Sequence, residues 1–253
     1  MSQLLANGRG KPTSPDAGLS LRVRVYADGA NLESMLVLAD DPLVQGFTTN
    51  PTLTRQSGVK DYATFARTVL RAIPDKPISF EVLADTPEDV RRQALAIAEW
   101  GDNVYVKVPV TTSDGKPLTD VIAGLSQRGV KVNVTAVFTL EQVWTACQAL
   151  RGGAPSVVSV FAGRVADSGR DPVPHMRSAL ALCRAADRSI ELLWASPREL
   201  LNVVQADEAG VDIITVTEAL RTKLHLLGKD LLEFSRETVL MFKRDAESAG
   251  YRL

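Results

Sequence analysis

Eight short runs rich in β-branched and other apolar residues alternate with amphipathic segments along most of this chain, and this alternation constrains the fold most strongly. The expected strands are Val23–Asp28, Leu43–Thr48, Ile78–Leu83, Val104–Val108, Val130–Thr135, Ser156–Phe161, Ile190–Ala195 and Val211–Val216. The segments with helical period between them include Tyr62–Ile73, Pro87–Glu99, Leu118–Gln127, Leu140–Leu150, Pro174–Ala185 and Pro197–Glu208. Strands that alternate with helices pair in parallel, and strands this apolar are covered on both faces. The pattern predicts an α/β fold, a single (β/α)8 TIM barrel.

An open doubly wound sheet is the alternative architecture. It would need a glycine-rich phosphate loop after the first strand, and Asp28-Gly29-Ala30-Asn31 is not such a loop. The length of 253 residues also suits one barrel. We expect residues 1–20, which are rich in Gly, Pro, Ser and Asn, to form a flexible tail. Residues 21–253 are expected to form one barrel domain, including an extra C-terminal helix over 228–248.

The balance of charge argues for a small ligand. The chain has 29 Lys and Arg against 30 Asp and Glu and no basic stripe with interleaved aromatic residues, so neither nucleic acid nor a membrane is an expected partner. No apolar stretch approaches the roughly 20 residues that span a bilayer. Residues 1–20 lack the apolar core of a signal peptide, and Cys147 and Cys183 lie in apolar helical contexts. These features predict a soluble protein of the reducing cytoplasm.

One lysine stands inside an apolar run, Asn103-Val104-Tyr105-Val106-Lys107-Val108-Pro109-Val110. Burial disfavours the ammonium form of a lysine, and the neutral amine attacks carbonyl carbons to form Schiff bases. The structural alternative is a lysine at a strand end that reaches water or a salt bridge. Considered alone, Lys107 fits that alternative better, and only its neighbours in the barrel favour catalysis.

Polar residues recur at the carboxyl ends of the expected strands, which meet on one face of a barrel. They are Asp28, Asn31, Thr48, Thr49, Asn50, Glu81, Lys107, Asn133, Thr135, Ser159, Arg164, Ser196 and Arg198. Asn133 and Thr135 are two residues apart and share a face of their strand. Glu81 lies on the strand next to Lys107, near enough for proton transfer to and from a Schiff base. Each residue alone has a structural explanation, but so many polar groups at strand ends together favour a catalytic site.

Three other functional classes can be compared with these residues, and only the last stays open. A binding protein that had lost catalysis would lack the nucleophile or the proton relay, and neither is missing. A metal-dependent aldolase would need clustered histidines, whereas His175 and His225 lie far apart on helical segments, so no metal is expected. A Schiff-base lyase acting on another keto acid or on deoxyribose phosphate stays open, because the same lysine chemistry serves many carbonyls.

From about Val23 to the final helix, the chain resembles the transaldolase family, including its smaller fructose-6-phosphate aldolase-like members. The matching motifs are Asp28-Gly29-Ala30-Asn31, Gly46-Phe47-Thr48-Thr49-Asn50-Pro51-Thr52-Leu53, Val106-Lys107-Val108-Pro109, Val132-Asn133-Val134-Thr135-Ala136-Val137-Phe138, Ser159-Val160-Phe161-Ala162-Gly163-Arg164 and Ala195-Ser196-Pro197-Arg198. The second and third motifs are the most specific. The resemblance implies transfer of a three-carbon dihydroxyacetone unit from fructose 6-phosphate or sedoheptulose 7-phosphate to an aldose phosphate, without a cofactor.

The resemblance also implies a role for each matching residue. Lys107 resembles the family's Schiff-base lysine, and Asp28 resembles the general base that removes the C4 hydroxyl proton so that the C3–C4 bond breaks. Glu81 and Thr135 are similar to the pair that moves protons through an ordered water. The substrate-binding residues that it implies are Asn50, Asn133 and Ser159 for the dihydroxyacetone unit, Phe161 beside them, and Arg164, Ser196 and Arg198 for the phosphate.

Two positions bear on transfer against lysis. Family members that act as transaldolases resemble this chain in having Glu and Phe at positions 81 and 161, where fructose-6-phosphate aldolases have Gln and Tyr. A phenylalanine cannot position or protonate a water as a tyrosine hydroxyl can. Transfer is therefore expected, with an aldolase-type lyase or a pathway-specific sugar transaldolase as the alternative. Departures from the usual motifs at Gly29, Thr52, Val160, Ala162 and Pro197 leave a specialised sugar pathway as open as central pentose phosphate metabolism.

The helix expected over 228–248 is longer than a barrel needs. Its apolar residues Leu231, Leu232, Val239, Leu240 and Phe242 lie among charged ones. Such a helix either caps the barrel or contacts a neighbouring subunit, which would make the protein a homo-oligomer.

Overall fold

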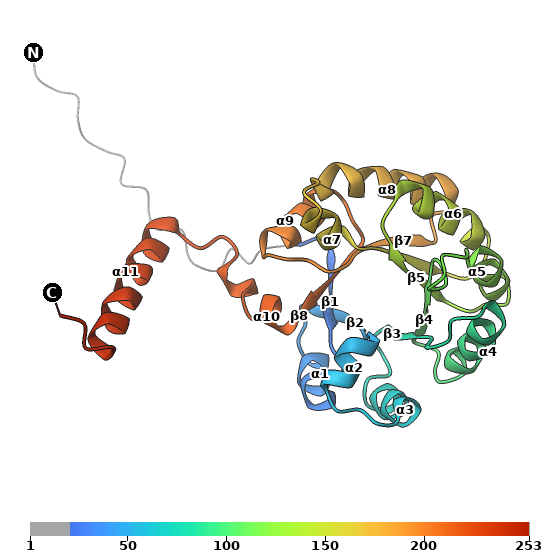
Figure 1. Cartoon of the computed structure of the whole chain (residues 1–253), viewed down its shortest axis with the longest axis horizontal. Helices are drawn as coiled ribbons and strands as arrows, with labels where there is room; N and C mark the ends of the chain where they lie inside the picture. Colours follow the sequence, from blue (N-terminus) through green and yellow to red (C-terminus); the bar gives the residue numbers. More distant parts are fainter. Residues whose placement is uncertain (1–20, 253) are drawn as a thin grey trace, which may run out of the picture. The chain divides into compact units, whose positions relative to one another are not determined.

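The structure, a computed structural model, describes residues 21–252, so the tail predicted over 1–20 lies outside the described residues. Eight parallel strands close into a barrel in chain order (Figure 1). They are β1 Arg24–Asp28, β2 Val44–Thr48, β3 Ile78–Glu81, β4 Val104–Pro109, β5 Val132–Val137, β6 Ser156–Val160, β7 Ile190–Trp194 and β8 Ile213–Thr217. This closed barrel confirms the predicted (β/α)8 fold and excludes the open sheet.

The helices of the barrel lie outside the ring of strands (Figure 1). They are α1 Leu32–Ala39, α2 Pro51–Gln56, α3 Tyr62–Ala72, α4 Pro87–Ala98, α5 Thr119–Ser126, α6 Leu140–Leu150, α7 Ala162–Asp167, α8 Pro172–Ala186, α9 Leu201–Glu208 and α10 Glu218–Arg221, followed by the 3-10 turn η1 Leu224–Leu226. Local sequence sets where the longer helices begin. The side chains of Asp61, Thr86 and Thr139 accept hydrogen bonds from the first turns of α3, α4 and α6, which satisfies amides that the helix leaves free.

The core has two parts because strand residues alternate between the faces of the sheet. The larger part packs the sheet against the helices, and a smaller cluster of Tyr26, Val157, Leu193, Ala195 and Ile213 is separate from it. A Cβ atom on Gly46 would lie 2.6 Å from the Tyr26 ring. Tyr26 and Gly46 are paired across β1 and β2, so the ring occupies the space that any larger residue at position 46 would need.

Several predicted boundaries differ from the observed ones. The helix predicted over Pro197–Glu208 begins only at Leu201. The residues before it form a loop, in which the amides of Arg198 and Glu199 donate to the Oδ1 atom of Asn202 at 2.7 and 3.2 Å. In a helix that began at Pro197 these two amides would lie in the first turn and lack an intrahelical acceptor, whereas in the loop the Asn202 side chain satisfies both.

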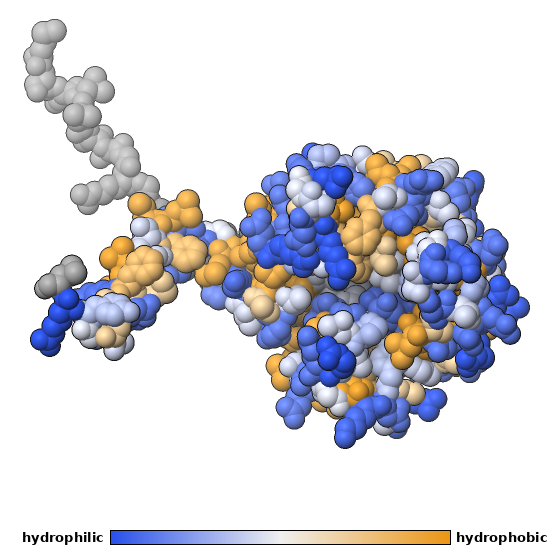
Figure 2. Space-filling model, in the orientation of Figure 1, coloured by the Kyte–Doolittle hydropathy of each residue, from blue (hydrophilic) through white to orange (hydrophobic). Residues whose placement is uncertain are grey.

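The C-terminal segment forms one helix, α11 Leu231–Ser248, which begins at Asp230, whose side chain accepts from the Glu233 amide. None of its residues is buried, and its exposed apolar side chains include Leu231, Leu232, Val239 and Phe242. Figure 2 shows apolar residues along this helix in orange. Residues 21–226 and the segment from Leu227 onward form separate compact units, and their membership of one domain stays a prediction. Over residues 21–252, no helix combines the length and apolarity needed to cross a membrane.

Candidate active site

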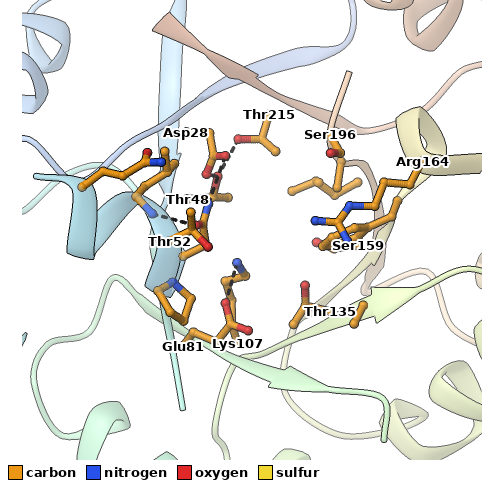
Figure 3. Close-up of a pocket in the computed structure, with 18 residues that line it drawn as sticks. Asp28, Thr48, Thr52, Glu81, Lys107, Thr135, Ser159, Arg164, Ser196 and Thr215 are labelled. Carbon is orange, nitrogen blue, oxygen red and sulfur yellow. Dashed lines mark hydrogen bonds and ion pairs between the residues drawn. The ribbon is translucent and has the colours of Figure 1, made fainter. Parts of the chain in front are cut away.

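A cavity of about 540 Å³ lies where the carboxyl ends of the strands meet, and Figure 3 shows its side chains. Its lining includes Asp28, Thr48, Asn50, Thr52, Glu81, Lys107, Thr135, Ala136, Ser159, Phe161, Arg164, Leu193, Ser196 and Thr215. The volume is that of an ordinary small-molecule site. Of the eleven residues proposed from the sequence, nine line this cavity, and Asn133 and Arg198 do not.

Lys107 and Glu81 form the buried ion pair of the site. They are register partners on β4 and β3, and the Nζ atom of Lys107 lies 3.1 Å from Oε2 of Glu81, with side chains 8% and 16% exposed. The amine also donates to the Thr49 carbonyl at 2.7 Å. Lys107 therefore does not reach bulk solvent, and its ion pair with Glu81 is the salt bridge that the structural alternative also allows. The amine and the carboxylate are close enough to exchange a proton directly.

Asp28 approaches the same cavity from β1. Its Oδ1 atom accepts from the Thr48 hydroxyl at 2.7 Å, and Oδ2 lies 3.4 Å from Nδ2 of Asn50. Burial raises the pKa of the Asp28 carboxyl above its usual range, and the nearby Lys107 charge and the Thr48 hydrogen bond only partly oppose this. A carboxylate with a raised proton affinity is suited to accept a proton from a substrate hydroxyl.

Asn133 is placed in a buried hydrogen-bond chain. It is the register partner of Lys107 on β5, but only 1% of it is exposed. Its Nδ2 atom donates to the Ser79 hydroxyl at 3.0 Å, and its Oδ1 atom accepts from the Ser159 hydroxyl at 2.7 Å. Ser159 thus links this buried amide to the cavity, which Ser159 and Thr135 both line.

Arg164 and Ser196 lie across the cavity from Thr48 (Figure 3). The guanidinium of Arg164 sits over the Phe161 ring, 5.2 Å from its centroid, which holds a planar cation in place. Ser196 adopts a left-handed backbone with φ of 62°. A Cβ atom on Gly163 would come within 1.6 Å of the Ser196 carbonyl oxygen, so α7 and the loop after β7 touch through their backbones at this glycine.

Arg198 is held by a carboxylate instead of facing the cavity. Its Nε atom lies 3.0 Å from both carboxylate oxygens of Asp167, and its Nη2 atom lies 2.5 Å from one of them. The two side chains are 44% and 51% exposed. Arg198 therefore reaches a ligand in the cavity only by leaving Asp167.

Thr215 and Tyr62 were not among the candidates from the sequence, whereas Thr48 was one of the polar strand-end residues, without an assigned role. Thr48 and Thr215 connect to Asp28 through hydroxyl contacts, and the Tyr62 hydroxyl accepts from the Glu81 amide at 2.8 Å. Thr215 had a readable signal, because it is a polar residue near the end of the eighth apolar run. Tyr62 had none, since it starts α3 and reaches the site only through the fold.

The arrangement contains the kinds of group that nucleophilic chemistry on a carbonyl requires. It combines a buried amine, a carboxylate beside that amine, a second carboxyl, and an arginine with a serine at the other side of one cavity. Among residues 21–252 no group of three His, Cys, Asp or Glu side chains is placed to hold a metal ion.

Solved structures with the same fold differ from this chain in sequence. A 3-hexulose-6-phosphate synthase matches with a TM-score of 0.55 at 18% identity, covering 81% of this chain and 94% of the other. An HpcH/Hpal aldolase/citrate lyase family protein from Burkholderia cenocepacia matches with a TM-score of 0.53 at 15% identity, covering 88% and 95%. At these identities the likeness shows the barrel fold alone.

Comparisons of sequence are more specific. A "Probable transaldolase" of Dehalococcoides mccartyi is 32% identical over 194 residues, covering 77% of this chain and 86% of that protein. A "Probable transaldolase" of Streptococcus equi subsp. zooepidemicus is 33% identical over 224 residues, covering 88% of this chain and 100% of that protein. The family model for transaldolase/fructose-6-phosphate aldolase matches residues 25–251. The chain therefore belongs to the transaldolase/fructose-6-phosphate aldolase family.

Proposed function

We propose that this protein is a transaldolase that moves a dihydroxyacetone unit from a ketose phosphate to an aldose phosphate through a Schiff base on Lys107. The observation that carries the proposal is the buried Lys107 amine, 3.1 Å from the Glu81 carboxylate in a cavity that Asp28 also lines. Schiff-base cleavage of a ketose needs a nucleophile, a proton carrier beside it and a separate base. These three side chains have the chemistry for those roles.

In the proposed first half-reaction, the Lys107 amine attacks C2 of the ketose to give a carbinolamine. Glu81, with Thr135 and a water, moves the protons that let the C2 oxygen leave as water. The resulting iminium withdraws electrons from the C3–C4 bond. Asp28 takes the proton of the C4 hydroxyl, the C3–C4 bond breaks, and an aldehyde leaves while its former bonding electrons form an enamine on Lys107.

In the proposed second half-reaction, the enamine carbon attacks the carbonyl of an aldose phosphate. Asp28 returns its proton to the new alkoxide, and water releases the product by hydrolysis of the iminium. Burial of the amine supports this sequence, because the enamine must be kept from solvent protons until the acceptor arrives.

Binding of a sugar phosphate is supported by the two sides of the cavity. Asn50 and Ser159 line it, and we propose that they hold the dihydroxyacetone hydroxyls, with Asn133 orienting Ser159. Arg164 and Ser196 are the proposed phosphate ligands, since a guanidinium offers paired donors and a hydroxyl adds another. A direct role for Arg198 remains a prediction that requires its release from Asp167.

Phe161 favours transfer over lysis in this proposal. Its ring lies in the cavity lining, with the Arg164 guanidinium 5.2 Å and the centroid of the Phe138 ring 5.6 Å from its own centroid. It brings no hydroxyl that could position a water to protonate the enamine. The alternative, a lyase that releases dihydroxyacetone, would instead hydrolyse the donor steadily without an acceptor.

Borohydride trapping tests the covalent intermediate. Reduction in the presence of fructose 6-phosphate or sedoheptulose 7-phosphate should add a sugar-derived mass to the peptide that contains Lys107. Lys107→Ala should lose both the adduct and turnover, whereas Lys116→Ala, which removes an exposed lysine paired with Asp114, should retain both. A missing adduct at Lys107 with every ketose tried would refute the proposed mechanism.

An assay of free dihydroxyacetone, with and without an aldose phosphate, separates transfer from lysis. We expect ketose consumption to depend on the acceptor and little dihydroxyacetone to accumulate. Steady release in the absence of any acceptor would assign the protein to the lyase branch instead.

Two further attributes belong to the proposal. The exposed apolar side chains of α11 suit contact with a second copy of the chain, so a homo-oligomer is proposed. The cytoplasm is the proposed location, with sugar phosphates as the only partners besides other copies of the chain.

A further inference from the structure

Two threonine hydroxyls form a short buried chain that ends on Asp28. The Oγ1 atom of Thr48 lies 2.7 Å from Oδ1 of Asp28 and 2.5 Å from Oγ1 of Thr215. Thr48 and Thr215 are 3% and 6% exposed. Figure 3 shows the three side chains in a row at one side of the cavity.

The topology of the barrel creates this contact. The strands β2 and β8 flank β1, and Thr48 is the register partner of Asp28. Thr215 is the partner of Tyr26, two residues before Asp28, so all these side chains point to one face of the sheet. The two hydroxyls meet because side chains on the inner face of a closed barrel converge.

The number of protons fixes the direction of the chain. Each hydroxyl has one proton to donate, and an ionised carboxylate can only accept. When Asp28 is ionised, the proton of Thr48 is used on the carboxylate, so Thr215 must donate to Thr48. When Asp28 is protonated, the carboxyl can donate to Thr48, which can then donate to Thr215.

We propose that Thr215 is a positioning residue, whose hydroxyl turns the proton of Thr48 onto the Asp28 carboxylate and thereby favours the ionised form that acts as base. The inference rests on the proposed function, in which Asp28 accepts the C4 hydroxyl proton. The bond from Thr48 to the carboxylate is charge-assisted, and a donor behind it polarises it further. Thr215 thus acts on the base through Thr48 and needs no contact with the substrate.

The other charged groups around Asp28 do not replace this chain. Lys107 from β4 favours the ionised form and Glu81 from β3 disfavours it, while Asn50 contributes a long contact of 3.4 Å. Arg221 of α10 lines a neighbouring cavity with Asp28 but pairs with Glu218 and Asp41. Burial raises the pKa of Asp28, so each donor to the carboxylate counts.

The test compares Thr215→Val, which exchanges the hydroxyl for a methyl group, with Thr215→Ser, which keeps the hydroxyl. In the pH profile of kcat/KM for donor cleavage, Thr215→Val should move the acid limb upward by about half a pH unit to one unit. Thr215→Ser should leave the limb within about 0.2 unit of the wild type, since it restores the donor. A limb that stays in place in Thr215→Val, with only KM or Tm changed, would mean that Thr215 merely fills space.

A double variant tests whether Thr215 acts through Thr48. Thr48→Val should move the limb further than Thr215→Val, and Thr48→Val/Thr215→Val should move it no further than Thr48→Val alone. Additive shifts in the double variant would overturn the proposed route.

A titration without substrate keeps this inference separate from the proposed function. The Asp28 carboxyl resonance, followed by carbon NMR and assigned with Asp28→Asn, should titrate at higher pH in Thr215→Val than in the wild type or Thr215→Ser. Identical titrations would overturn the inference even in an active transaldolase. If no ketose is cleaved, the function proposed above fails, and this titration still decides whether Thr215 favours the ionised form of Asp28.

Discussion

At the scale of the residue, the two arginines of the proposed phosphate site are unequal. Arg164 is held over the Phe161 ring in the cavity lining, while Arg198 is engaged by Asp167 outside it. A guanidinium that already faces the ligand needs no exchange of partners to bind a phosphate. The two positions therefore predict unequal losses on truncation.

Arg164→Ala should raise the KM of fructose 6-phosphate by about 10- to 100-fold, because a charge-assisted contact to phosphate is lost. Arg198→Ala should raise it less, since release from Asp167 offsets part of the gain. Unphosphorylated donors serve as the control, because neither variant should change their KM. If Arg164→Ala changed the KM of neither phosphorylated nor unphosphorylated donors, Arg164 would not be a phosphate ligand.

Asp28 should lower the stability of the fold at neutral pH. Burial raises the pKa of Asp28 in the folded state, so the folded protein binds this proton more tightly than the unfolded chain does. The stability that the bound proton supplies is therefore lost as the pH rises through the folded pKa. Asp28→Asn should accordingly be more stable at pH 7, by on the order of 1 kcal/mol or 2–4 °C in Tm, with the gap closing below about pH 4.

Asp61→Asn provides a control of opposite sign for this measurement. The Asp61 carboxyl accepts from the Thr64 hydroxyl and amide, which lower its pKa, so its contribution is present at neutral pH and lost in acid. This variant should gain no stability at pH 7. Thermal melts at several pH values that ranked Asp28→Asn below the wild type at pH 7 would contradict the assignment.

At the scale of the element, the inside of the barrel depends on a glycine. Gly46→Ala would push a methyl group into the buried Tyr26 ring, 2.6 Å away. Overpacking of this kind costs about 1–3 kcal/mol, which predicts a fall in Tm of roughly 2–4 °C per kcal/mol. Gly124→Ala on α5 is the matched control, because nothing lies within 4 Å of its new methyl group and alanine favours a helix. Equal melting temperatures for the two variants would contradict this packing.

Strand order and strand ends were predictable because alternating apolar runs admit one closed parallel arrangement. The helix boundary before Leu201 was not, because the Asn202 side chain accepts from the two preceding loop amides, and the sequence does not reveal that contact. The burial of the Trp194 side chain on the outer face of the sheet was also not predicted from the sequence. Its neighbours Leu193 and Ala195 line the cavity, whereas Trp194 is fully buried in the core between sheet and helices, so its bulk leaves the cavity unfilled.

The candidate site, like the fold, was predictable in its strand-end residues but not in the contacts between distant segments. Lys107, Glu81 and Asp28 were identifiable as polar residues at strand ends, since each strand end faces the same cavity. The capture of Arg198 by Asp167 was not, because both residues lie in segments whose relative placement depends on the whole fold. The Thr48–Thr215 contact escaped prediction for the same reason, as it crosses an intervening strand.

At the scale of the whole molecule, the exposed apolar stripe of α11 predicts self-association. Leu232, Val239 and Phe242 recur at helical spacing and are 82%, 63% and 61% exposed. Leu232→Glu/Phe242→Glu in the full chain should lower the mass measured by light scattering toward that of a monomer, because each carboxylate would have to be buried. Arg244→Gln changes the charge of the same helix without touching the stripe and should leave the mass unaltered. If light scattering showed the wild-type protein to be a monomer, the proposed homo-oligomer would be wrong.

The backbone contact at Gly163 restricts how such a protein can change its substrate. With the Ser196 carbonyl 1.6 Å from where a side chain would begin, the peptide that bears Arg164 and the loop that bears Ser196 are wedged together with no room for a spacer. A side chain at position 163 would force the two segments apart and so increase the separation of Arg164 and Ser196, the proposed phosphate ligands. New sugar preferences should therefore evolve, or be engineered, through substitutions of cavity-lining side chains such as Phe161 and Leu193. Position 163 should stay glycine.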